Sequence, residues 1–214
     1  FIKNIDAIHY MTNDEFENCF FQRKTDYNKI ILPNSISIDT DYIKSTEKEK
    51  NFFLYVGRLA KNKNIDFMVN VFNFLKNDFK MKKFSLIIMG PDYGEKNNLL
   101  EKIKHLKLDK MIKIYDPIYS NERLSFILDA KAVLLASDYE CNSIAIAEAL
   151  SLGTVVISTE ECNTKDISNY GACITTYKNE EIFAKEMIRL FDEIHFNSIK
   201  LKAKEYAKNF LDLD

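Results

Sequence analysis

The chain has 214 residues and a formal net charge of -2, because 30 Lys and Arg residues stand against 32 Asp and Glu residues. This balance gives no argument for nucleic acid or for an anionic membrane as a partner. With 46% hydrophobic and 29% charged residues, the composition is typical of a soluble globular chain of one domain, or of one domain and a piece of another. The four cysteines show neither CxxC nor His-paired spacing, which favours reduced thiols in a cytoplasmic protein. No apolar run approaches the roughly 20 residues of a membrane span.

The first fifty residues contain two short apolar segments, 7–12 and 29–34, that predict strands, with a polar helix expected between them over 13–23. The charged segment 45–51 is typical of a solvated connector ahead of a main domain. The chain begins on Phe1, with no initiator Met and no signal peptide, so we expect it to be a piece of a longer protein.

From residue 52 onward, short apolar runs alternate with helical patterns, which is typical of a parallel α/β sheet. Strands are predicted over 52–57, 84–90, 112–116, 132–137, 154–159 and 173–177, and helices over about 64–77, 95–107, 121–130, 143–152 and 179–194. A basic amphipathic surface helix is expected over the final stretch, 198–214. Strands this continuously apolar need helices on both faces, so the predicted fold class is a Rossmann-like α/β sheet. Because such sheets bind ligands at the carboxyl ends of their strands, the residues that follow each strand are the candidates for a site.

The loop after the strand at 52–57 is basic. Gly57 is followed by Arg58, Lys61 and Lys63, ahead of a helix expected to begin near Asn64. A glycine lets the backbone turn sharply, and cations beside the N–H groups of a helix N-terminus make an anion site. A solvated basic loop would explain the same residues. Neither GxGxxG nor GxxxxGK[ST] occurs, so the dinucleotide fingerprint and the P-loop are both absent.

A second candidate loop follows the strand at 132–137 and holds Glu140, with Glu148 eight residues later in a helix whose N-cap is predicted at Asn142 or Ser143. Along a helix, eight residues span roughly 12 Å, too far for two carboxylates that share one proton. This separation suits the two ends of an elongated ligand that crosses a helix N-terminus. The alternative is a surface Glu140 and a Glu148 that pairs with a neighbouring Lys.

Together, these strand ends resemble a known family. The segments "VGRLAKNKNID", "LIIMG" and "ECNSIAIAEALSLGTVVIS", the last with its E-x7-E spacing, are similar to the C-terminal half of GT-B retaining glycosyltransferases of the group 1 (family 4) type, and the match covers about residues 29 to 194. The resemblance implies that residues 1–34 are the remnant of an N-terminal acceptor domain with its linker, and that 35–214 form the Rossmann-like domain that binds the nucleotide sugar. It also implies a truncated enzyme, which alone would bind a sugar donor and transfer the sugar poorly or not at all.

The resemblance assigns a role to each candidate residue. Arg58 and Lys63 would neutralise the diphosphate of the sugar donor, and Glu140 would lie near the transferred sugar. Glu148 would accept hydrogen bonds from the ribose hydroxyls. Further contacts to the sugar donor are expected from Gly57 at the strand end and from the backbone N–H groups of Asn142, Ser143 and Ile144.

The family resemblance also implies the partners. The sugar donor would be a UDP-, GDP- or ADP-linked hexose, the acceptor a saccharide or a lipid-linked glycan, and no metal or other cofactor is expected. The anomeric configuration would be retained, by a route with no assigned protein nucleophile. The full-length enzyme would act in the cytoplasm, with peripheral association at the inner face of the membrane.

One segment departs from the family pattern. The chain has Cys141-Asn142-Ser143 where the family usually has Gly-Phe-Gly after its first glutamate. The change adds side chains near the sugar and restricts the backbone, so the identity of the sugar donor stays open. Two other readings also stay open, a GT-B nucleotide-sugar epimerase and a non-catalytic module that binds a nucleotide sugar.

Overall fold

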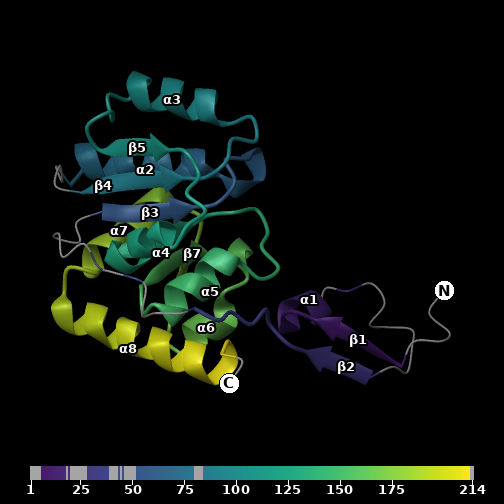
Figure 1. The fold of residues 1–214 in the computed structure, drawn as a ribbon. Coiled ribbons are helices and arrows are strands. Elements are labelled where there is room, and N and C mark those ends of the chain that lie inside the picture. The colour runs from purple at the N-terminus through teal and green to yellow at the C-terminus, as the bar shows by residue number, and fades with distance from the viewer. Residues whose placement is uncertain are drawn as a thin grey trace.

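The six apolar runs from residue 52 onward all pair into one parallel sheet in the computed structural model, which describes residues 6–17, 19, 28–38, 43, 45, 52–79 and 84–212 (Figure 1). Its strands are β3 (Phe52–Val56), β4 (Ser85–Met89), β5 (Ile112–Tyr115), β6 (Ala132–Leu135), β7 (Val156–Thr159) and β8 (Ile174–Thr176). Their order across the sheet is β5-β4-β3-β6-β7-β8. Each strand lies within two residues of its predicted limits.

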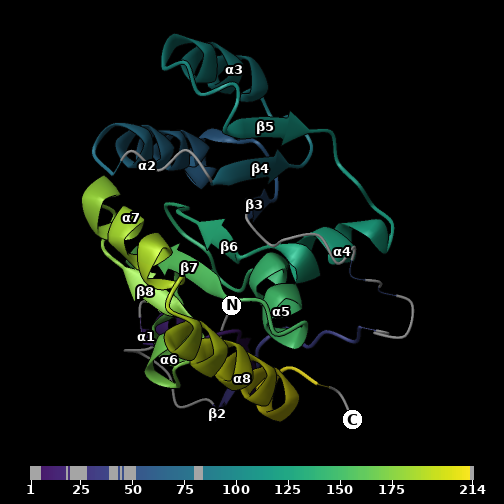
Figure 2. The same ribbon diagram turned by 90° about the vertical axis from the view of Figure 1, so that its left-hand side faces the viewer.

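Helices cover both faces of this sheet, which confirms the predicted fold class (Figure 2). The helices on one face, α2 (Ile65–Asn77), α3 (Lys96–His105) and α7 (Glu180–Arg189), bury apolar side chains against Phe53, Leu86 and Leu134 of the strands. On the other face, α4 (Glu122–Asp129), α5 (Ile144–Ser151), α6 (Lys165–Asn169) and α8 (Glu193–Phe210) pack against the alternate strand residues, among them Leu54 and Val133. Both sets of strand side chains are fully buried because each face of the sheet is covered.

The strand order contains a switch point between β3 and β6. From β3 the chain moves outward through β4 to β5, and then returns to the other side of β3 and moves outward again from β6 to β8. The crossovers on either side of β3 therefore run in opposite directions, which leaves a crevice outside the carboxyl ends of β3 and β6. The two loops predicted to hold ligand, after residues 57 and 137, leave the sheet at this point.

The predicted helix over 179–194 is wrong at its C-terminal end. α7 stops at Arg189, and α8 begins at Glu193 rather than near residue 198. The Asp192 side chain accepts a hydrogen bond of 2.9 Å from the backbone N–H of His195, so Asp192 is the N-cap of a new helix. The short helix α6 and the 3-10 turns η3 (Lys61–Lys63) and η4 (Glu160–Cys162) were not predicted.

The N-terminal segment forms a separate two-stranded parallel sheet of β1 (Ala7–Tyr10) and β2 (Asn28–Ile31), with α1 (Asn13–Glu17) between them, and lies to one side of the main sheet (Figure 1). Asn163 Nδ2 donates to Thr12 Oγ1 at 3.0 Å, which ties this segment to the main body. Most of the predicted helix beyond Glu17, and the connector 45–51 apart from Ser45, lie outside the described residues. The predicted domain boundary at residue 34 stays a prediction.

None of the helices in these described segments is long and apolar enough to cross a membrane.

Candidate functional site

The loop after β3 turns sharply and projects its cations from the sheet edge. Tyr55 Oη donates to the carbonyl of Arg58 at 2.8 Å, and this bond fixes the first turn of the loop. The 3-10 turn η3 carries Lys63 and ends at Asn64, which adopts a left-handed conformation with φ of 48°. Asn tolerates this conformation better than most residues. The 3-10 turn therefore ends at Asn64 in the sequence "NKNID", and α2 begins at Ile65.

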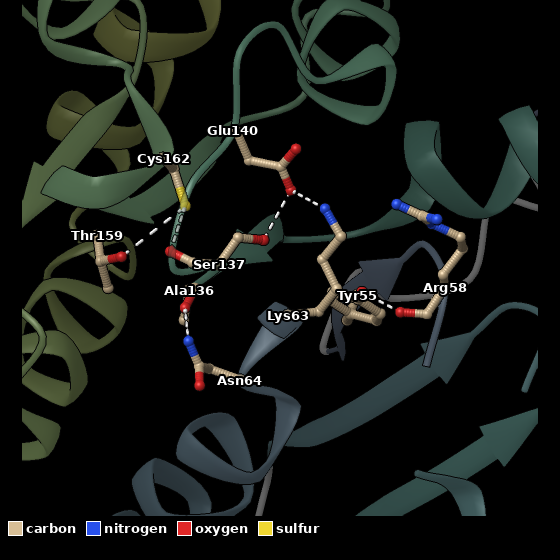
Figure 3. A network of polar contacts seen from close by, with 9 residues as sticks. All are labelled: Tyr55, Arg58, Lys63, Asn64, Ala136, Ser137, Glu140, Thr159 and Cys162. Atoms are coloured by element: carbon tan, nitrogen blue, oxygen red, sulfur yellow. Dashed lines mark hydrogen bonds and ion pairs between the residues drawn. The ribbon is translucent and has the colours of Figure 1, made fainter. Parts of the chain in front are cut away.

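Glu140, from the loop after β6, meets Lys63 from the loop after β3 (Figure 3). Lys63 Nζ lies 2.5 Å from Glu140 Oε1, and Ser137 Oγ donates to the same oxygen at 2.6 Å. The Lys63 and Glu140 side chains are only 12% and 15% exposed. Both donors converge on one oxygen, so the Glu140 carboxylate is held in place as a hydrogen-bond acceptor.

Three further hydrogen bonds fasten the same pair of loops. Asn64 Nδ2 donates to the carbonyl of Ala136 at 3.0 Å and to Asp138 Oδ1 at 2.5 Å, and the backbone N–H of Asp138 donates to the carbonyl of Asn62 at 2.9 Å. The hydrogen bonds from Asn64 and Lys178 lower the pKa of Asp138 below its usual value. The switch point is therefore braced by side chains and does not depend on strand pairing alone.

A pocket of about 300 Å³ opens at this edge of the sheet. Its lining includes Gly57 and Arg58 after β3, Gly90 after β4, and Ile144 at the start of α5. The N–H groups in the first turn of a helix have no partner within the helix, so the start of α5 adds partial positive charge to this wall. The pocket thus brings together three of the predicted residues, Gly57, Arg58 and Ile144.

Arg58 is one of two arginines that line this pocket. Its guanidinium lies 5.3 Å from the centre of the Tyr93 ring. Figure 3 draws no interaction from the Arg58 guanidinium to the other residues shown. In the parts of the chain that the structure describes, no carboxylate pairs with Arg58, whereas Lys63 is paired.

Glu148 lies in the second turn of α5 and is buried, with 5% of its surface exposed. Both of its carboxylate oxygens accept hydrogen bonds from the guanidinium of Arg123, on the first turn of α4. The partner of Glu148 is therefore an arginine and not the lysine of the alternative reading. Glu140 precedes α5, which begins at Ile144, so the helical spacing of roughly 12 Å between the two glutamates does not apply.

Asn142 and Ser143 line a different cavity. This second pocket, of about 380 Å³, lies between α5, α6, α8 and the N-terminal segment, and Cys141 lines it as well. Partial burial and the nearby carboxylate of Glu15, on α1, raise the pKa of the Cys141 thiol. Ser143 is the N-cap of α5 by its backbone conformation, with φ of -77° and ψ of 120°. The Cys-Asn-Ser departure from the family thus faces the N-terminal segment.

Two residues of the site were missed in the sequence. Ser137 is the last residue of the predicted strand 132–137, so the rule that favours residues at strand ends could have found it. Arg123 gave no such signal, because an arginine in the first turn of a surface helix is usually solvated.

These features define an α/β protein of the Rossmann type, with a pocket at the switch point of its sheet that is lined by Arg58 and by the start of α5. The chain belongs to the family described as Glycosyl transferases group 1, whose sequence model matches residues 38–210.

Relatives of known name agree with this family. The chain is 28% identical over 152 residues to the capsular polysaccharide biosynthesis glycosyltransferase CapH of Staphylococcus aureus, with 70% of this chain and 39% of the relative covered. It is 27% identical over 188 residues to the Campylobacter jejuni N-acetylgalactosamine-N,N'-diacetylbacillosaminyl-diphospho-undecaprenol 4-alpha-N-acetylgalactosaminyltransferase, with 84% of this chain and 49% of the relative covered. The chain therefore spans at most about half the length of these two relatives.

A solved structure shows the same fold. The crystal structure of HepE from Anabaena in complex with UDP and glucose superposes with a TM-score of 0.82 at 15% identity, and the match covers 97% of this chain and 59% of the other. The expected fold, the C-terminal half of a GT-B glycosyltransferase, is thereby confirmed.

Proposed function

We propose that the chain is the sugar-donor-binding domain of a retaining glycosyltransferase, of the family 4 type, that transfers a hexose from a nucleoside diphosphate sugar to a glycan or a lipid-linked acceptor. The observation that carries this proposal is the pocket at the switch point, where Arg58 has no carboxylate partner among the described residues and the first turn of α5 faces the same space. A diphosphate leaving group gains negative charge as the sugar departs, and fixed cations and N–H groups stabilise that charge.

The relatives support the chemical classes in this proposal. The name of the Staphylococcus aureus relative places it in capsular polysaccharide synthesis, and that of the Campylobacter jejuni relative describes a lipid-linked acceptor. The Anabaena structure holds UDP and glucose. A bound nucleotide sugar is therefore the ligand we expect for this chain. Because the chain spans at most about half the length of the two relatives, we expect transfer itself to need a further domain.

The environment of Glu140 favours a route without a protein nucleophile. Its Oε1 already accepts hydrogen bonds from Lys63 and Ser137, which lowers the reactivity of the carboxylate toward a sugar carbon. We infer that Glu140 binds sugar hydroxyls or stabilises positive charge at the anomeric carbon, and that the anomeric configuration is retained. The cytoplasm, or the inner face of the membrane, stays the predicted place of action.

Calorimetric titration of the chain with UDP, GDP and ADP tests the proposal. We expect one of the three to bind with a dissociation constant below about 1 mM, which is the affinity of a weak specific ligand. Arg58→Ala should weaken that affinity about tenfold or more through the loss of one charge-assisted contact, while Arg189→Ala, an exposed arginine on α7, should leave it unchanged. No binding of any of the three at millimolar concentration would contradict the proposal.

We expect the affinity to be independent of metal. The described residues include no group of three or more His, Cys, Asp or Glu side chains that could hold a metal ion, and Arg58 supplies the charge instead. Repeating the titration with excess EDTA should change the dissociation constant by less than about twofold, within the scatter of such measurements.

A binding module without transferase activity is the second candidate. The observation that favours it is the segment Cys141-Asn142-Ser143, whose side chains line the cavity next to the N-terminal segment in place of the family's glycines. Product analysis with the intact protein separates the candidates, because a transferase lengthens an acceptor, an epimerase changes the free nucleotide sugar, and a module does neither. Unchanged cellular glycans after Glu140→Ala and Arg58→Ala in the intact protein would favour the module.

A further inference from the structure

The outward side of α8 carries exposed aliphatic side chains. Ile194 and Leu201 are separated by about two helical turns, so they lie on the same side of the helix, and they are 85% and 69% exposed. The opposite side of α8 packs against α5 through Ala203 and Ala207. α8 itself lies at the edge of the main body (Figure 1). The two aliphatic side chains therefore face away from the core.

Lysines surround these aliphatic side chains. α8 contains four lysines and two glutamates, whereas the whole chain has a net charge of -2, so the positive charge is a local property of this helix. The lysines are Lys200, Lys202, Lys204 and Lys208. Lys204 and Lys208 are exposed, and neither forms an ion pair within the described part of the chain. Their charges are therefore available to an anionic partner.

The two glutamates of α8 do not cancel these charges. Lys202 Nζ donates to Glu205 Oε2 at 2.9 Å, and Tyr170 Oη donates to Oε1 of the same carboxylate at 2.8 Å. Glu193 lies in the first turn of α8, about three helical turns before Lys204, where it interacts favourably with the helix dipole. The outward side of α8 therefore keeps a net positive charge.

The combination of residues on this side favours a lipid surface over a protein partner. Aliphatic side chains flanked by lysines on one side of a helix are typical of helices that lie in the interface of an anionic bilayer. In that position the aliphatic side chains enter the headgroup region, and the lysines meet the lipid phosphates. Two isolated aliphatic side chains cover far less area than the roughly 800 Å² per partner of a stable protein interface.

We propose that the outward side of α8, formed by Ile194, Leu201, Lys204 and Lys208, binds the anionic headgroups of a lipid bilayer. The local charge of this helix carries the inference, together with the exposure of the two aliphatic side chains. The inference is independent of the proposed function, because none of these four residues lines the pocket at the switch point.

Sedimentation with lipid vesicles tests this inference. Vesicles made of equal parts of phosphatidylglycerol and phosphatidylcholine are anionic, and vesicles of phosphatidylcholine alone have no net charge. The wild-type chain should bind the anionic vesicles at least about tenfold more strongly, because each lysine near the surface adds electrostatic attraction. NaCl at about 0.5 M should remove most of this preference, since salt screens charges at a surface.

Two double variants separate the contribution of charge from that of the aliphatic side chains. Lys204→Gln/Lys208→Gln should weaken binding to the anionic vesicles about tenfold or more. Ile194→Ser/Leu201→Ser should weaken it about fivefold or more, because less apolar surface is removed from water. All four side chains are exposed, so both variants should keep the circular dichroism spectrum of the wild-type chain.

Matched controls lie at the opposite edge of the molecule, on and near α3 (Figure 1). Lys104→Gln/Lys110→Gln makes the same change in net charge at two exposed positions. Leu100→Ser removes an aliphatic side chain that is 46% exposed. Both controls should bind the anionic vesicles within about twofold of the wild-type chain.

The outcomes are distinct. No binding of the wild-type chain to the anionic vesicles, or equal losses in the α8 variants and the α3 controls, overturns this inference. A dimer in analytical ultracentrifugation that Ile194→Ser/Leu201→Ser abolishes, without any binding to vesicles, overturns it in favour of a contact between two copies of the chain. Each of these results leaves the proposed function standing, because nucleotide binding is measured in a separate titration.

Discussion

The interaction between Lys63 and Glu140 sets the charge that the site offers to an anion. Each side chain is largely buried, and the two lie 2.5 Å apart. The positive charge of Lys63 is thus partly cancelled, and within the described residues Arg58 remains as the cation of the pocket without a carboxylate partner. Under the proposed function, a sugar donor would have to attract Lys63 in competition with Glu140.

Glu140→Gln should therefore have opposite effects on binding and on turnover. Glutamine has nearly the same shape but no charge, so Lys63 becomes available and the affinity for the nucleoside diphosphate should rise about threefold to tenfold, as for a partly screened charge a few ångströms away. Sugar transfer by the intact protein should fall. Glu161→Gln is the control, since it makes the same change in net charge at an exposed position on η4. Weaker binding by Glu140→Gln, or an equal gain in the control, would contradict this account.

At the scale of elements, the close approach between the ends of β3 and β4 requires a glycine at position 90. The backbone N–H of Gly57 donates to the carbonyl of Met89 at 3.0 Å. The residue after Met89 is Gly90, whose φ is +155°. A Cβ at Gly90 would lie 1.8 Å from the carbonyl oxygen of Gly57. Both glycines line the pocket at the switch point, so this close approach shapes the site as well as the sheet.

Gly90→Ala should destabilise the chain by about 3 kcal/mol or more, because it combines a backbone clash with an unfavourable conformation. Gly94→Ala is the matched control. Its φ is +97°, but a Cβ there would meet nothing within 4 Å, so its cost should stay near 1 kcal/mol. Urea unfolding of both variants measures the difference, and equal losses would show that the contact between the strand ends carries no strain.

The elements that could be predicted are those whose burial is visible in the local pattern of apolar residues. The inner strands were found because they are buried on both faces and therefore largely apolar, as in β6. The break between α7 and α8 was missed because the apolar pattern of α7 runs on past Arg189, and the cap at Asp192 competes with that pattern.

For the site too, local sequence patterns predicted some residues and missed others. Arg58 follows a strand end, where parallel sheets bind ligands, so its place in the pocket could be expected. Arg123 could not be found in this way, because its partner Glu148 is 25 residues away. The pairing is decided by the packing of α4 beside α5, which no local pattern contains.

At the scale of the whole molecule, stability depends on keeping several ionisable groups neutral in the core. Burial raises the pKa of Tyr55, raises that of Cys162 to about 11 and raises that of Cys173 to about 12. In the unfolded chain both thiols return to a pKa near 8.5. The unfolded state therefore loses these protons first as the pH rises, while the folded state keeps them.

It follows that the two thiols contribute their full stability below about pH 8.5, and that this contribution is lost as the pH rises toward 11 and 12. Between pH 8 and pH 10 the free energy of unfolding should fall by about 1–2 kcal/mol for each thiol, in addition to the effects of other groups. The double variant Cys162→Ala/Cys173→Ala, although less stable at every pH, should show a correspondingly smaller fall. Urea unfolding at pH 8, 9 and 10 measures both slopes. Identical slopes would mean that the two thiols ionise in the folded chain as readily as in water, and that the core around them does not exclude their charge.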